Sequence, residues 1–309
     1  MVSVSVIVPV YQGESTIMAC ARSVLCQDYA SVKLIIVDDG STDATNSLTD
    51  CIATEDDRVM VVHTANRGRQ AARLKGVELS TSEWITFVDA DDCLPVDAVS
   101  LLAQAISDDV DIIFGNGYSL NGESRNIIPM DDFRHMAVRG DGTIGVPWGS
   151  LYRRSVLTPY LFNQPKDFYM GEDYIFWLRL VFSTEKPVAV VLDNVYEKGS
   201  DTTSAGFLWT IDYVALIQKY REQSIPPDRY EEYIHETIAD RLANLCAVAL
   251  CQRGNNWRSH SFTLRLKADI ARTAYHVSLP TRIYLSLPSL WLRKLWRQTL
   301  NMISMFIKP

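Results

Sequence analysis

The sequence is poor in the features that mark secreted, zinc-stabilised or membrane-spanning proteins. Its six cysteines, spread over 309 residues, form no Cys-x-x-Cys pair and no cluster with histidine at the spacing of zinc ligands, so neither a disulfide framework nor a structural zinc site is expected. No stretch reaches the roughly 18 apolar residues of a membrane-spanning helix, and the chain begins in a strand-like run instead of a signal peptide. We therefore expect a protein of the reducing cytoplasm.

Two common nucleotide-binding patterns are also missing. No GxxxxGK[ST] sequence follows a strand, which argues against a P-loop, and no GxGxxG sequence follows the first strand, which argues against a dinucleotide site.

Charge is distributed unevenly along the chain. The net charge is −7, but residues 281–309 contain five cations and no acid, so the rest of the chain carries −12. An acidic body argues against nucleic acid as a partner, whereas a basic tail points to an anionic surface.

The chain does contain a regular alternation of strands and helices. Continuous apolar runs rich in β-branched residues are typical of buried parallel strands, and they occur at residues 3–8, 32–37, 59–63 and 85–88. Helices are expected between them, at about residues 14–27, after residues 41–42, and up to about residue 79. This order indicates a Rossmann-like, mostly parallel α/β sheet with helices on both faces.

Polar clusters follow three of the four strands, at residues 9–13, 38–43 and 89–92. The carboxyl ends of parallel strands meet at one edge of the sheet, so these clusters should face one crevice, where ligands bind in such folds.

The densest cluster holds Asp89, Asp91 and Asp92 within four positions. Carboxylates this close repel one another, so a hard divalent cation such as Mg²⁺ or Mn²⁺ would explain them, and a metal held by acids favours a nucleotide-diphosphate substrate. The alternative is a solvated turn that caps the helix after Pro95.

Five motifs resemble those of the family 2 glycosyltransferases with the GT-A fold, in the same order and spacing. They are VSVIVPVYQGE (4–14), LIIVDDGSTDAT (34–45), NRGRQAARLKG (66–76), EWITFVDADD (83–92) and GEDYIFWLRL (171–180). The resemblance covers residues 2 to about 200. It implies a GT-A catalytic domain at 1–205, with a nucleotide-binding half at about 1–118 and an acceptor half at about 119–205.

The chain departs from the family pattern at four positions. The family usually has Asn at Gln12, Asn at Leu74, Gly at Ser82 and Lys at Ser150. None of these departures removes a carboxylate, so they put donor and acceptor details in question more than activity.

The resemblance implies that Asp39 binds the nucleobase, with Pro9, Tyr11 and Glu14 lining the same pocket. A carboxylate is a strong acceptor for the imide N–H of uracil. The alternative for Asp38 and Asp39 is a turn at the end of the strand, and one of the two could serve only that turn.

The resemblance also implies that Arg73 meets the pyrophosphate and that Asp89 and Asp91 form the DxD element, with Asp91 as the direct metal ligand. Alternate residues of an extended stretch point the same way, so both could reach one site, while Asp92 would point toward the ribose or a supporting bond. For Arg73 the alternative is a solvated helix face.

Asp173 is implied as the general base, which takes the proton of the attacking hydroxyl. The alternative is that Glu172 and Asp173 only complement the dipole at the start of a helix. Direct attack assisted by a single base inverts the anomeric carbon.

Residues 121–170 are punctuated by glycines and could shape an acceptor groove. Within them Trp148 and Tyr152 could stack on a sugar, although core packing is the expected role. Residues 196–201 only weakly match a family loop near the pyrophosphate.

The last third, residues 206–309, is expected to be helical, with one helix at about 228–253. A basic amphipathic tail is expected at about 289–308, with Leu295 and Trp296 on the apolar face and Arg293, Lys294 and Arg297 on the other. This tail could lie on an anionic inner leaflet or pack on the catalytic domain with its basic side solvated.

Together these features predict an inverting, metal-dependent hexosyl- or N-acetylhexosaminyltransferase that moves a sugar from a nucleotide-sugar, a UDP-sugar by preference, to a glycan or lipid-linked acceptor. The resemblance suggests bacterial surface-polysaccharide assembly, in the cytoplasm or peripherally at the inner face of the plasma membrane. Two alternatives are a sugar-nucleotide pyrophosphorylase, whose Gly-rich first turn is missing here, and an inactive nucleotide-sugar-binding subunit, against which the intact Asp39, Asp91 and Asp173 argue.

Overall fold

The computed structural model describes residues 2–115, 126–140, 145–165, 168, 171–199, 210–252 and 254–307, and side chains of the last helix up to residue 298. The chain divides into two compact units. The first comprises Met1–Ala137 and Asp141–Thr203, and the second comprises Val138–Gly140 and Ser204–Pro309. The boundaries expected near residues 118 and 205 lie outside the described residues.

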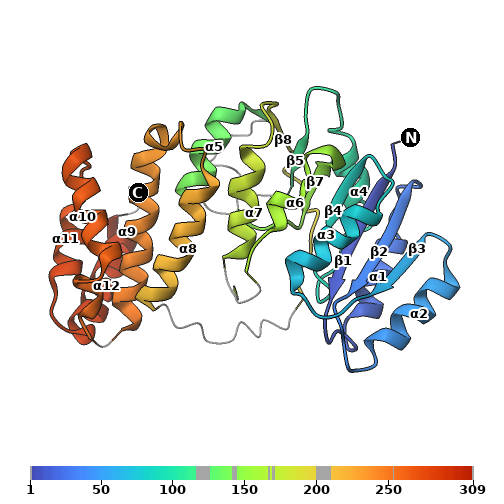
Figure 1. The fold of residues 1–309 in the computed structure, drawn as a ribbon, viewed down its shortest axis with the longest axis horizontal. Helices are drawn as coiled ribbons and strands as arrows, with labels where there is room; N and C mark the ends of the chain where they lie inside the picture. Colours follow the sequence, from blue (N-terminus) through green and yellow to red (C-terminus); the bar gives the residue numbers. More distant parts are fainter. Residues whose placement is uncertain are drawn as a thin grey trace. The chain divides into compact units, whose positions relative to one another are not determined.

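The first unit is built on one sheet, which has eight strands within the described residues and the order β3-β2-β1-β4-β7-β5-β8-β6 (Figure 1). The strands are β1 (Val4–Val10), β2 (Val32–Asp38), β3 (Val59–His63), β4 (Trp84–Phe87), β5 (Ile112–Phe114), β6 (Ile127–Ile128), β7 (Ser150–Arg153) and β8 (Val188–Val190). The first four strands are parallel, and β7 runs antiparallel between β4 and β5. The expected mostly parallel α/β sheet is confirmed. Strand order reverses beside β1, which places a crevice beyond the ends of β1 and β4.

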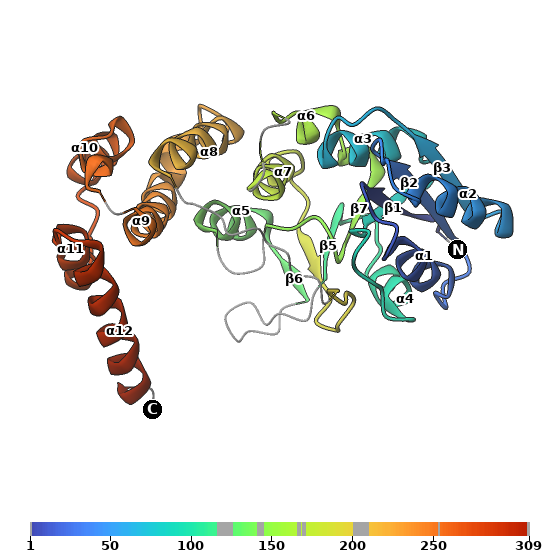
Figure 2. The ribbon, with the colours of Figure 1, turned by 90° about the horizontal axis from the view of Figure 1, so that it is seen from below.

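Helices cover both faces of this sheet (Figure 2). They are α1 (Ile17–Leu25), α2 (Thr45–Glu55), α3 (Arg69–Leu79), α4 (Ala98–Ala103), α5 (Met130–Arg139), α6 (Pro159–Phe162) and α7 (Glu172–Val181). Side chains alternate between the two faces of a strand. Ile7 of β1 therefore packs in the core that α3, α6 and α7 cover, whereas Val6 and Val8 pack in the core that α1 and α4 cover.

Helix α1 begins three residues later than the sequence indicates. The backbone N–H of Gly13 donates to Thr45 Oγ1 at 2.9 Å and that of Glu14 to Asp43 Oδ2 at 3.2 Å. These residues bind the turn after β2 and are therefore not part of the helix.

The second unit is helical, as expected. It contains α8 (Ile211–Ser224), α9 (Ile234–Cys251), α10 (Ser261–Thr273), α11 (Leu279–Ser286) and α12 (Leu290–Ile307). Its core includes Ile238, Leu245 and Trp257. The helix expected at 228–253 is divided, because a 3₁₀ turn at Tyr230–Tyr233 precedes α9.

Helix α12 forms where the tail helix was expected, and it contacts α9 and α11 of its own unit. The expected placement of Arg293 on the solvated basic face is wrong. Its side chain is fully buried. The guanidinium donates hydrogen bonds to Asn255 Oδ1 at 3.0 Å and to the Gln252 carbonyl oxygen at 3.2 Å. Lys294 and Arg297 are exposed, and Lys308 lies outside the described residues. No helix in the described part of the chain combines the length and apolar character needed to span a bilayer.

Candidate active site

The loop after β4 gives its three carboxylates different surroundings. Asp91 is exposed, and its carboxylate accepts no hydrogen bond within the described residues. Asp92 is buried and accepts hydrogen bonds from the Tyr196 hydroxyl at 2.6 Å and from the Gly199 backbone N–H at 2.7 Å. Burial raises the pKa of the Asp92 carboxyl above its ordinary value. Asp92 therefore supports the loop, whereas Asp91 is available to a ligand.

Arg73 joins the DxD loop to the start of α7. Its side chain is fully buried and lies over the ring of Phe87, 5.9 Å from the centroid. The guanidinium donates through Nη2 to Asp89 Oδ1 at 2.9 Å and through Nη1 to Asp173 Oδ1 at 2.5 Å. A solvated helix face is thereby ruled out for this arginine. The guanidinium is thus the shared counter-ion of both carboxylates.

Asp173 lies in the first turn of α7, where its predicted role as base requires an accessible oxygen. Its Oδ1 also accepts a hydrogen bond from Gln70 Nε2 at 3.0 Å, and its side chain keeps 18% of its surface exposed. Within the described residues Oδ2 accepts no hydrogen bond. One oxygen therefore fixes the orientation of the carboxylate and the other is free to accept a proton.

Glu172 lies beside Asp173 but has a different environment. Burial raises the pKa of its carboxyl, and the negative charge of Asp173 raises it further. Its nearest cation is Arg69, whose Nη1 is 3.6 Å from Glu172 Oε1.

The loops after β1 and β2 hold the residues expected around the nucleobase. Asp39 is buried and accepts hydrogen bonds from the backbone N–H groups of Arg67 and Gly68, at 2.8 and 2.7 Å. Glu14 Oε2 accepts the backbone N–H of Ala44 at 3.0 Å. Asp39 thus connects the end of β2 to the loop before α3, and Glu14 connects the loops after β1 and β2.

Pro9 is a buried residue of β1, paired in register with Val37 of β2. Tyr11 is exposed, with 54% of its surface accessible, and Glu14 is exposed as well. The structure therefore brings the four expected residues to the ends of β1 and β2, where the ring of Tyr11 is accessible to a base.

The neighbouring Asp38 has the turn role that the sequence left open. It is fully buried and accepts the backbone N–H of Ser41 at 3.0 Å. Its other oxygen lies 2.9 Å from Nδ1 of His63, whose Nε2 lies 3.1 Å from Asp50 Oδ1. Hydrogen bonds to Asp38 and Asp50 raise the pKa of His63 above 6.5.

Sequence reasoning missed the segment at residues 196–199 as part of this site. Its backbone pairs with the DxD loop through Cys93 and Glu197. The Tyr196 hydroxyl accepts the backbone N–H of Asp89 at 3.1 Å, and a Cβ on Gly199 would lie 2.0 Å from the Asp91 carbonyl oxygen. This close approach explains why residue 199 is a glycine. The pairing joins residues about a hundred positions apart, so the sequence around residues 196–199 contains no pattern that would predict it.

The two aromatic residues considered for sugar stacking have different surroundings. Trp148 packs against residues 196–199: its ring stacks on that of Tyr196, with the ring centroids 4.2 Å apart, and Lys198 Nζ lies 4.5 Å from the Trp148 centroid. Tyr152 is fully buried in the core, so core packing, not sugar stacking, is its role.

The acids at this site fit a metal that a substrate helps to hold. Within the described residues no three metal-binding side chains gather into a cage. Magnesium, however, is commonly held by one or two carboxylates together with substrate phosphates. Asp91 and Asp89 Oδ2, which accept no hydrogen bond within the described residues, are the carboxylates that such a metal would use.

Comparison with known proteins agrees with this geometry. Residues 5–169 match the glycosyl transferase family 2 profile. The chain is 30% identical over 254 residues to the uncharacterized glycosyltransferase YibD of Escherichia coli K12, covering 77% of this chain and 63% of YibD. It is 36% identical over 239 residues to the glycosyltransferase GlyA of Streptococcus pneumoniae, covering 71% of this chain and 34% of GlyA. The chain thus spans less than two thirds of these relatives.

Solved structures share the fold at low sequence identity. Residues 1–349 of S. aureus TarS, in complex with UDP-GlcNAc, superpose with a TM-score of 0.58 at 17% identity, covering 89% of this chain and 93% of that one. The mannosyltransferase PcManGT of Pyrobaculum calidifontis, in complex with GDP-Man and Mn²⁺, gives 0.57 at 18% identity, covering 97% and 87%. The chain therefore belongs to glycosyl transferase family 2 and has the GT-A fold.

Proposed function

We propose that this protein transfers a sugar from a nucleotide-sugar to a hydroxyl of a glycan or glycolipid acceptor, with inversion of the anomeric carbon. The observation that carries the proposal is the ion-paired bridge Asp89–Arg73–Asp173. It ties the acid-rich loop, where a donor diphosphate would bind, to the carboxylate that would act as base. The groups that would stabilise the leaving diphosphate and the group that would take the proton of the acceptor hydroxyl therefore lie in one site.

Asp173 is the proposed catalytic base. An attacking hydroxyl must lose its proton as the bond to the anomeric carbon forms, and the free Oδ2 is the acceptor for that proton. Arg73 and Gln70 hold Oδ1 and so orient the carboxylate. The proposed reaction needs only Asp173 Oδ2 as proton acceptor and no second carboxylate as nucleophile, which supports direct displacement and inversion.

Asp91 and Asp89 are proposed to hold Mn²⁺ or Mg²⁺ together with the donor diphosphate. When bound, the cation would neutralise the negative charge that develops on the departing nucleotide. Asp92 keeps Asp91 exposed by fixing the loop to residues 196–199. Arg73 is proposed to act on the pyrophosphate indirectly, by holding Asp89 in place. Its guanidinium already donates hydrogen bonds to the carboxylates of Asp89 and Asp173.

The donor is proposed to be a UDP-sugar, carrying a hexose or an N-acetylhexosamine. Asp39, Pro9, Tyr11 and Glu14 are the proposed nucleobase pocket, and uridine is proposed because a carboxylate such as that of Asp39 is a strong acceptor for the imide N–H of uracil. On the same fold TarS is in complex with UDP-GlcNAc and PcManGT with GDP-Man, so both kinds of donor belong in the test. The Asp39 carboxylate accepts hydrogen bonds from two backbone N–H groups. A carboxylate has about four acceptor positions, so it can accept a further hydrogen bond from the N–H of a base.

The setting is proposed to be cell-surface polysaccharide assembly, with residues 1–205 as the catalytic domain. On α12 the exposed apolar residues are Trp291 and Leu295, with 67% and 45% of their surfaces accessible, and Lys294 and Arg297 are exposed as well. Tryptophan and basic residues together favour the interface of an anionic membrane. A cytoplasmic enzyme held peripherally at the inner leaflet would meet a lipid-linked acceptor there.

The test is release of UDP and sugar from a panel of nucleotide-sugars with Mn²⁺, for the wild type and Asp173→Asn. We expect one donor class to be consumed and the variant to be slower by about 10²- to 10⁴-fold, the usual range for a general base, with donor affinity nearly unchanged. Equal rates in the two proteins would exclude Asp173 as the base. Formation of UTP and sugar 1-phosphate when pyrophosphate is added would favour the pyrophosphorylase alternative, and donor binding without turnover would favour a binding subunit.

A further inference from the structure

The helical unit contains a cavity that the transfer reaction does not use. It lies among α9, α10 and α11 and has a volume of about 810 Å³, within the ~300–1,000 Å³ range of small-molecule sites. Its floor is apolar, since Leu245, Trp257 and Leu266 line it with at most 3% of their surfaces exposed.

The charged residues of this cavity have one sign. Arg258, Lys267 and Arg282 line it, and no carboxylate does. Arg258 donates to the carbonyl oxygens of Leu285 and Leu287, at 2.9 and 2.6 Å, which are neutral acceptors. Lys267 and Arg282 are exposed and make no ion pair within the described residues. Three cations without a counter-ion above an apolar floor complement a ligand with an anionic head and an apolar body.

Other basic residues of α10 show that this imbalance is local. Arg272 is paired with Glu231, at 2.9 Å, and Arg265 with Glu222, at 2.8 Å. Cations of the same helix that face α8 or the turn before α9 thus have acids opposite them, whereas Lys267 at the cavity has none.

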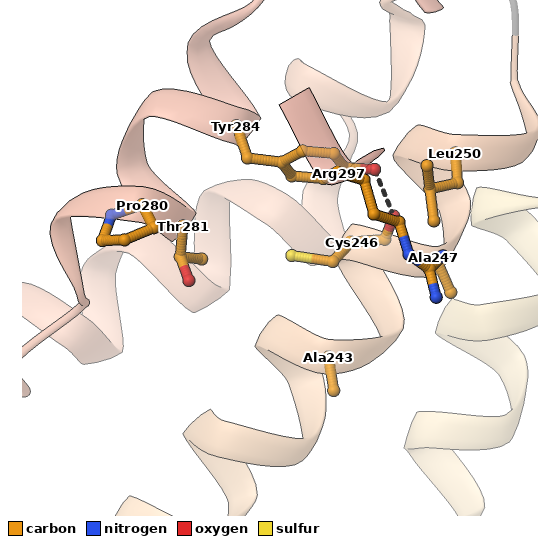
Figure 3. A pocket seen from close by; sticks show the side chains of 8 residues that line it. All are labelled: Ala243, Cys246, Ala247, Leu250, Pro280, Thr281, Tyr284 and Arg297. Carbon is orange, nitrogen blue, oxygen red and sulfur yellow. Dashed lines mark hydrogen bonds between the residues drawn. The ribbon is translucent and has the colours of Figure 1, made fainter. Parts of the chain in front are cut away.

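Two smaller cavities continue from the large one, and the second is lined by Arg297 of α12. One, of about 300 Å³, shares Leu242, Tyr275 and His276 with the large cavity. It also shares Ala243 and Cys246 with a cavity of about 340 Å³. Figure 3 shows the latter, with Pro280 and Thr281 on one side, Leu250 on the other, and the Tyr284 hydroxyl donating to the Cys246 carbonyl. Neighbouring cavities in this run therefore share residues of α9.

We infer that this run of cavities binds a single-chain anionic lipid. The phosphate or carboxylate head lies against Lys267 and Arg282, and the hydrocarbon chain covers the floor of Leu245, Trp257 and Leu266. None of the residues that line the large cavity belongs to the proposed active site or to α12. The inference goes beyond the proposed sugar transfer and does not depend on it, because binding is measured without donor.

The experiment is calorimetry of the full chain with three soluble probes below their micellar concentrations: lysophosphatidic acid, lysophosphatidylcholine and glycerol 3-phosphate. They separate the contributions of anionic head and chain. We expect binding of lysophosphatidic acid, with the other two weaker by at least about tenfold, because each lacks one half of the complementary pair. Glycerol 3-phosphate binding as tightly would show that no chain is seated, and equally tight lysophosphatidylcholine would show that anionic charge is irrelevant; either result overturns the inference.

Two pairs of matched variants place the ligand. Ala271→Trp fills the cavity from α10, and Ala268→Trp adds the same group to an exposed position of the same helix that does not line it. Lys267→Gln with Arg282→Gln removes two cavity cations, and Lys219→Gln with Lys33→Gln removes two exposed cations elsewhere. We expect the first of each pair to weaken lysophosphatidic acid binding by at least about tenfold and the second to leave it unchanged. Equal effects within a pair would contradict this location.

Binding of UDP with Mn²⁺ is measured on the same samples. Loss of that binding with lipid binding retained would count against the proposed function alone, and the reverse would count against the lipid site alone.

Discussion

At the scale of single residues, the acids of the site differ by what surrounds them. Asp92 accepts hydrogen bonds from Tyr196 and Gly199, and one oxygen of Asp89 accepts a hydrogen bond from Arg73. The Asp91 carboxylate accepts none within the described residues. The sequence places these carboxylates within four positions but cannot show which of them is free. For Asp92 that distinction comes from partners more than a hundred residues away.

Replacement of Arg73 by methionine should be strongly destabilising. The variant leaves Asp89 and Asp173 without their counter-ion, in positions where each has 18% of its side chain exposed. Breaking such a buried pair costs about 3–5 kcal/mol. Denaturant unfolding should show this loss, whereas Arg69→Met on the same helix, where the arginine is 52% exposed, should cost at most about 1 kcal/mol. Similar values for both variants would contradict the bridge.

At the scale of elements, the close contact between the DxD loop and residues 196–199 can be tested through its glycine. Gly199→Ala places a Cβ 2.0 Å from the Asp91 carbonyl, so the loop must shift. We expect UDP affinity with Mn²⁺ to fall by at least about tenfold, since small displacements of positioning groups are costly. In Gly145→Ala the added Cβ meets only Tyr174 Cδ2 at 3.5 Å, and affinity should be retained. Unchanged binding in Gly199→Ala would show that this contact does not position Asp91.

A histidine links β2, β3 and α2 and makes stability depend on pH. The His63 pKa is raised above 6.5 by hydrogen bonds to Asp38 and Asp50, so the protonated form stabilises the fold. That contribution is fully present below the unfolded value of 6.5 and is lost as the pH rises through the folded value. The melting temperature of the wild type should therefore exceed that of His63→Gln by more at about pH 5.5 than at about pH 8.5. A difference that is constant or grows with pH would contradict this assignment.

The sequence predicts the first four strands to within two residues because each is a continuous apolar run. It does not reveal β5, β6 or β8, which have two or three residues each, because so few residues show no period. Helix α3 was expected to end at Leu79, as it does, whereas the start of α1 depends on side chains of the β2 turn. In the site, the identity of Arg73 was predictable, but its burial between two acids depends on packing of α3 against α7.

At the scale of the whole molecule, the chain combines an acidic body with a helical unit whose last elements are basic. Only Asp269 is acidic between residues 261 and 309, and that aspartate is paired with Arg241 at 2.8 Å. This division of charge favours contact of the helical unit with an anionic surface.

This arrangement predicts binding to anionic vesicles through α12. Trp291→Ser with Leu295→Ser should reduce sedimentation with phosphatidylglycerol vesicles, because both side chains are exposed and apolar. Leu216→Ser with Leu264→Ser removes two comparably exposed leucines from α8 and α10 and should have little effect. Equal sedimentation of wild type and the α12 variant would show that this face does not bind membranes.

The central claim is that the site binds a uridine diphosphate through a metal held by Asp91. The most direct measurement is calorimetric titration of UDP, GDP and ADP, with and without Mn²⁺, into the wild type and Asp91→Asn. The account predicts Mn²⁺-dependent binding of UDP in preference to the other two, abolished in Asp91→Asn while the melting temperature is retained. Binding of no nucleotide by the wild type, or equally tight Mn²⁺-dependent binding of UDP by the variant, would contradict it.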